Sequence, residues 1–294
     1  MKLSLNLLIL MSIAFFLFLQ SCSINSNKKS GKDDSDEIDS NILLTSTIEV
    51  FNTIPSPVMA AQLINNAGVK FDEKILNPVK NVPYYETSQS MALNLGVYCA
   101  DLSFTSFYDQ KQITMDYLAA IKTIADGLGL INLLKQEDII KLEENIYNKD
   151  SIKVLIENIF LSSGQFLNEN NRPQIALMVE VGGWIEGIYI AMQLAKQSGH
   201  INKELVDRIS EQRSSLLLVI SSLENFSKIE QINNVLIDMN KLKVIYDKMI
   251  VPVDEDSKTK NTLTSENNTT ANITPEIFLS LYHEINRIRN SYTQ

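Results

Sequence analysis

The sequence predicts an all-α protein, an irregular bundle of about eight to nine antiparallel-paired helices. Helix-forming residues dominate its 294 positions, while glycine (10) and proline (7) are sparse. Apolar residues recur at helical spacing, and no segment shows the alternation of a half-buried strand. Connections between these periodic segments are short, which favours antiparallel packing of successive helices.

The first residues have the pattern of a secretory signal peptide, predicted to span 1–21. Lys2 supplies the positive start, an apolar run follows from Leu5 to Leu19, and the small residue Ser21 comes last. The run is shorter than the roughly 20 residues that a membrane-spanning helix needs. We therefore expect an export signal at this end of the sequence.

The end of this segment, Leu19-Gln20-Ser21-Cys22, resembles the lipobox of bacterial lipoproteins. The resemblance implies that Cys22 becomes the mature N-terminus and carries fatty acyl chains such as palmitate, which anchor the protein to a membrane. In Gram-negative lipoproteins, an Asp directly after the cysteine signals inner-membrane retention. Ser23 stands there instead, which favours the outer membrane and leaves the periplasmic and surface faces open.

A tether and a single helical domain are predicted to follow. Residues 22–53 are assigned to the lipidated cysteine and a flexible tether, because 23–41 is too polar to bury a core. The helical domain is predicted at 54–294. Within it, the polar, low-complexity segment 253–272 is predicted to be a mobile loop.

Start and stop signals divide this domain into helices. Ser56 suits an N-cap, Pro57 the first helical position and Gly68 a C-terminal cap. The predicted helices cover 57–66, 88–107, 109–127, 136–148, 151–168, 173–196, 203–226, 229–250 and 275–290. Asp109 is the predicted cap of the third. Residues 69–87 form a predicted connector, anchored by Tyr84 and Tyr85.

The segment 173–196 is apolar on nearly all sides, yet it contains Glu180 and Glu186. An all-round apolar helix is either a membrane span or the centre of a bundle. Two acids would cost several kcal/mol in a bilayer, so we interpret this segment as the central helix of a soluble body. Gly183 and Gly187 lie on one side of it and are predicted to allow close contact with a neighbouring helix.

Three acids are candidate buried polar positions: Asp101, Glu180 and Glu186. Asp101 lies on an otherwise apolar helix face and could meet Glu180 across the bundle, where the two carboxylates could hold a metal ion. The alternative is that each acid is satisfied by a hydroxyl, a lysine or an arginine. Glu186 lies about 120° around the helix from Glu180, so these two do not share a face.

Other chemistry has little support in the sequence. The net charge of −9 disfavours nucleic acid as a partner. His200 and His283 lie in no ligand-spaced motif, and Cys99 lies on an apolar face as a small core residue. We therefore predict no catalytic residue, metal ligand or cofactor.

Three stretches also resemble a family of uncharacterised all-helical Gram-negative envelope lipoproteins. They are IPSP at 54–57, NLGVYCADLSFTSFYDQKQ at 94–112 and GGWIEGIY at 182–189. The resemblance implies a tethered helical domain and brings neither a known activity nor catalytic residues.

The sequence therefore favours a lipid-anchored, non-enzymatic binding or scaffolding module, whose partner is an envelope protein or a small ligand. The alternative is a carboxylate-based metal-binding protein or enzyme that uses Asp101 and Glu180. A third interpretation is a short helical solenoid with a peptide groove. The geometry of the acids distinguishes the first two, because catalysis or metal binding requires them to converge in an open cleft.

Overall fold

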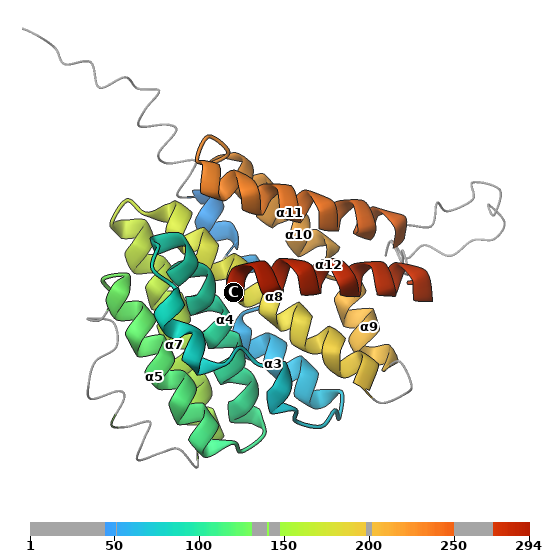
Figure 1. The fold of residues 1–294 in the computed structure, drawn as a ribbon, viewed down its shortest axis with the longest axis horizontal. Helices are drawn as coiled ribbons and strands as arrows, with labels where there is room; N and C mark the ends of the chain where they lie inside the picture. Colours follow the sequence, from blue (N-terminus) through green and yellow to red (C-terminus); the bar gives the residue numbers. More distant parts are fainter. Residues whose placement is uncertain (1–44, 51, 131–139, 141–147, 198–201, 250–272) are drawn as a thin grey trace, which may run out of the picture. The chain divides into compact units, whose positions relative to one another are not determined.

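The computed structural model describes residues 45–50, 52–130, 140, 148–197, 202–249 and 273–294. Within these ranges the chain is helical and contains no strand, which confirms the predicted all-α bundle (Figure 1). The predicted signal peptide, Cys22, the mobile loop and most of the helix at 136–148 lie outside the described residues.

The helical unit begins before the predicted boundary at Ile54. Residues 45–50 and 52–53 are helical, and Thr47 and Val50 are completely buried. Val50 and Ile54 are four residues apart and so share one helix face, which packs into the core. The end of the predicted tether, at residues 45–50 and 52–53, therefore belongs to the folded body.

Capping explains where the first long helices begin. α3 (Pro57–Asn66) starts as predicted, with the Ser56 hydroxyl accepting from the Met59 amide. α4 (Ser88–Phe107) has the predicted bounds and begins with a capping box. α5 (Lys111–Gly127) has Gln110 at its N-cap position, in place of the predicted Asp109, and Gln110 makes no side-chain capping hydrogen bond. Asp109 has a φ of 58°, which places it in the turn before the helix.

The next two helices, α7 (Lys149–Glu169) and α8 (Pro173–Gln197), agree with the prediction. The predicted helix 203–226 is instead two helices, α9 (Lys203–Ser210) and α10 (Arg213–Glu224). The Ile209 carbonyl accepts from the Gln212 amide and from the Tyr246 hydroxyl, so the helical ladder is interrupted there. α11 (Glu230–Tyr246) and α12 (Pro275–Thr293) complete the described part.

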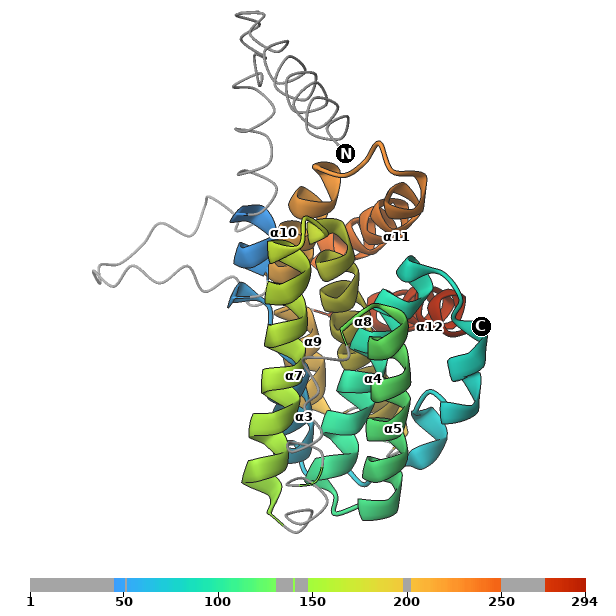
Figure 2. The same ribbon diagram turned by 90° about the vertical axis from the view of Figure 1, so that its left-hand side faces the viewer.

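α8 is the centre of the bundle. It contacts α3, α4, α7, α9, α10 and α12, most extensively α4 (Figure 1), while α5 and α7 also pack against α4 (Figure 2). Among the described helices, α8 alone is long and apolar enough to span a membrane, yet 89% of its most apolar window is buried by protein. This burial supports the interpretation as a central helix. Contacts between helices far apart in sequence argue against a solenoid.

α4 and α8 cross with their backbones in contact. A Cβ atom at Gly182 would overlap the carbonyl of Leu93, and a Cβ at Gly96 would overlap that of Val179. The predicted contact glycines have more room. The nearest atoms to a Cβ at Gly183 and at Gly187 lie 3.3 Å away, and for Gly187 that atom is the Ala60 Cβ of α3. Gly96 and Gly182, which the prediction did not name, make the tightest part of the α4–α8 contact.

We expect Gly182→Ala to lower the free energy of unfolding by about 2–3 kcal/mol, because the new methyl group forces the two backbones apart. Gly187→Ala is the matched control on the same helix. There, the gain of about 1 kcal/mol in helix propensity should offset mild crowding. Urea unfolding followed by circular dichroism measures both values, and equal stability of the two variants would contradict the close crossing.

Candidate functional site

The strongest polar contact of the core joins α8 to α12. The Glu186 carboxylate accepts from Nε and Nη2 of Arg289 at 2.9 and 3.0 Å, and the two side chains are 0% and 8% exposed. The Arg289 guanidinium also lies over the ring of Tyr189, 4.5 Å from its centroid. This two-point contact compensates the charge of a fully buried carboxylate.

Asp101 of α4 lies beside this ion pair. Its Oδ2 accepts from the backbone N–H of Asn77 at 3.1 Å, whereas Oδ1 has no hydrogen-bond partner in the described structure. Burial raises the pKa of Asp101 well above its usual value, and Glu186 raises it further, while Arg289 and the Asn77 N–H lower it. A proton on Asp101 would remove the repulsion between the two carboxyl groups and supply a donor for Glu186.

The connector between α3 and α4 packs against the cluster of Asp101, Glu186 and Arg289. It contains two short 3₁₀ turns, Glu73–Ile75 and Val79–Tyr84. Asn77, directly before Pro78, is completely buried and donates through its side chain to Tyr85 and Asn94. Its carbonyl accepts from the Tyr117 hydroxyl at 2.8 Å. Of the two predicted anchors only Tyr85 is correct, because Tyr84 is 72% exposed.

The end of α12 is fixed by the same side chains. Asn94 donates to the Tyr292 carbonyl at 2.7 Å, and the Tyr85 hydroxyl donates to the Thr293 carbonyl at 3.2 Å. These carbonyls belong to the last turn of the helix, where intrahelical donors are missing. The network therefore fixes the connector, α4 and α12 relative to one another.

Glu180 lies apart from this cluster, so the structure does not bring Asp101 and Glu180 together as the alternative function required. Glu180 is 1% exposed, its charged neighbour is Glu157 of α7, and its Oε2 has no partner among the described residues. Burial, then Glu157, raises the pKa of Glu180 well above its usual value. Asp101 instead meets Glu186, which faces the other side of α8.

Neither acid cluster has the form of an open reaction site. Asp101, Glu180 and Glu186 are all buried, and the described chain contains no group of three or more Asp, Glu, His or Cys side chains that could hold a metal ion. Cys99 is buried, and burial, with a contribution from Asp101, raises the pKa of its thiol to about 12. The thiol is therefore protonated at neutral pH and acts as the predicted small core residue.

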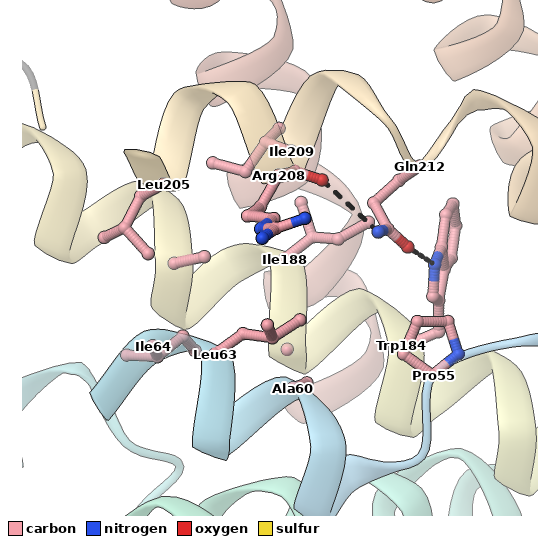
Figure 3. A pocket seen from close by; sticks show the side chains of 12 residues that line it. Pro55, Ala60, Leu63, Ile64, Trp184, Ile188, Leu205, Arg208, Ile209 and Gln212 are labelled. Carbon is pink, nitrogen blue, oxygen red and sulfur yellow. Dashed lines mark hydrogen bonds between the residues drawn. The ribbon is translucent and has the colours of Figure 1, made fainter. Parts of the chain in front are cut away.

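An apolar pocket lies on another side of α8, between α3 and α9 (Figure 3). It has about 480 Å³ of empty space, part of it open to solvent. Its apolar walls are formed by Leu63, Ile64, Ile188, Ala191, Leu205 and Ile209. Each helix contributes residues three or four apart, so three helix faces meet here.

Polar groups line one part of this pocket. The Trp184 indole N–H donates to Oε1 of Gln212 at 3.1 Å, and Nε2 of Gln212 donates to the Arg208 carbonyl at 3.3 Å (Figure 3). The Arg208 guanidinium supplies a positive charge and also contacts the Glu211 carboxylate at 3.1 Å. This pocket could not be predicted from the sequence, because its lining comes from the relative placement of three helices.

Comparisons with protein-family models, with curated proteins and with solved structures found no match to this chain.

We expect the protein to lose stability as the pH rises from 4 to 8, and Asp101→Asn to reduce this loss. The folded-state pKa of Asp101 is raised. The contribution of Asp101 to stability is therefore complete below its unfolded-state pKa of about 3.9. It is lost as the pH rises through the folded-state pKa. Asparagine keeps an acceptor for the Asn77 amide and cannot ionise. Urea unfolding at several pH values measures this difference.

Glu186→Gln is the contrasting variant, because it leaves the Arg289 charge buried without a counter-charge. We expect it to cost about 3–5 kcal/mol at pH 7. An Asp101→Asn protein whose stability depends on pH as steeply as that of the natural chain would refute the assignment of the proton to Asp101.

Proposed function

We propose that this chain is a lipid-anchored helical protein of the bacterial envelope and that it acts by non-covalent binding rather than by catalysis. The observation that carries this proposal is the separation of the candidate acids. Asp101 faces the Glu186–Arg289 ion pair, Glu180 faces Glu157, and both acids are buried. An enzyme or carboxylate metal site would need acids that converge in an open cleft.

The pocket between α3, α8 and α9 supports a binding role. Its apolar walls, with a small number of polar groups at one part, have the composition typical of small-ligand sites. The helices around it are fixed by the core, because α8 packs against six other elements. The pocket is therefore held in shape by the body of the protein.

The N-terminal sequence supports the anchor. The apolar run before Cys22 suits an export signal, and the resemblance of Leu19–Cys22 to a lipobox makes Cys22 the proposed lipidation site. Several acyl chains would hold the protein at a membrane, whereas one chain binds only marginally. Ser23 favours the outer membrane over the inner membrane.

We expect Cys22→Ser to abolish the acyl mass and to move the protein out of the membrane fraction of a Gram-negative host. Intact-mass spectrometry and membrane fractionation measure the two effects. Cys99→Ala is the matched control, because Cys99 is the other cysteine of the chain and is buried. It should leave both the acyl mass and the membrane fraction unchanged.

Ser23→Asp tests the prediction that the lipid anchor lies in the outer membrane. We expect this variant to keep its acyl mass and to shift from the outer to the inner membrane in a sucrose gradient. An unmodified Cys22 thiol in the natural mature chain would rule out the lipid anchor.

A further inference from the structure

The polar lining of the pocket between α3, α8 and α9 presents one charge to a ligand. Gln212 is already engaged, since its Oε1 accepts from Trp184 and its Nε2 donates to a backbone carbonyl. Arg208 is the charged side chain among the lining residues, and Figure 3 shows its guanidinium turned toward the pocket. Among the described lining residues, the pocket therefore combines apolar walls with a single cation.

Arg208 is able to accept a second anionic partner. Its contact with Glu211 is three residues along the same helix, and the two side chains are 48% and 59% exposed. Such exposed pairs contribute little free energy. A guanidinium has five N–H donors, and one of them is used on Glu211. A carboxylate at the pocket would add a charge-assisted hydrogen bond without breaking a strong one.

The size of the pocket limits its ligand. The space exists because small residues, Ala60, Gly187 and Ala191, line it where longer side chains would fill it. Its 480 Å³ of empty space includes open solvent, so the enclosed part of the pocket is smaller than a typical small-ligand site of roughly 300–1,000 Å³. A short apolar chain fits this space better than a long-chain lipid.

We propose that this pocket binds a short-chain amphipathic carboxylate, with its apolar chain between α3, α8 and α9 and its carboxylate at Arg208. The proposal rests on the binding role inferred above and names its ligand class. Apolar burial supplies the affinity, and the charge at Arg208 selects an anionic head group over a neutral one.

Trp184 provides a direct measurement, because it is the single tryptophan of the chain and lines the pocket. The full chain is placed in phosphatidylcholine vesicles and titrated with octanoate or with its neutral analogue octanamide, while Trp184 fluorescence is recorded. We expect a saturable change with both probes and about threefold to fivefold tighter binding of octanoate, as for an exposed ion pair.

Three variants separate the contribution of the Arg208 charge to binding from that of the apolar walls. Arg208→Gln should remove the preference for octanoate and leave octanamide binding unchanged. Lys203→Gln, a matched loss of an exposed cation from the same helix, should keep the preference. Ala60→Leu, at a half-buried position of the wall, should abolish the response to both probes.

No saturable change in the natural chain, or an equal preference for octanoate in the natural and Arg208→Gln proteins, would overturn the proposal. Neither result would affect the lipid anchor, which is measured separately by the mass and membrane fraction of Cys22→Ser.

Discussion

The close crossing of α4 and α8 depends on two glycines, Gly96 and Gly182, each of which faces a backbone carbonyl of the other helix. Because the backbones meet there, α4 and α8 bury the side chains around their contact, including Asp101 and Glu186. Arg289 then supplies the compensating charge from α12. α12 therefore supplies the counter-charge for an acid that this contact removes from water, in addition to its apolar contacts with the core.

Features fixed by local sequence were predictable. The bounds of α4 and the starts of α3, α8 and α12 follow from capping residues and prolines near the helix ends. The break between α9 and α10 was not predictable from the segment 203–226. At the break, the Ile209 carbonyl accepts from the Gln212 amide and from the Tyr246 hydroxyl of α11. The second of these partners lies 37 residues away, so the local pattern does not reveal it.

The candidate site was predicted only in part. Periodicity correctly placed Asp101, Glu180 and Glu186 in the interior. It could not indicate which acid of α8 faces α4, because that depends on the rotation of one helix relative to another. The decisive partners are also distant in sequence: Asn77 lies 24 residues before Asp101, and Arg289 lies 103 residues after Glu186.

The carbonyls at the end of α12 accept from side chains that precede them by about two-thirds of the chain. Tyr85 and Thr293 are separated by 208 residues, and Asn94 and Tyr292 by 198. Such non-local closure is entropically costly and slows folding. Until α12 docks, the buried Glu186 carboxylate lacks the guanidinium of Arg289. The polar contacts of this core are therefore complete only when the last described helix joins segments made much earlier in the chain.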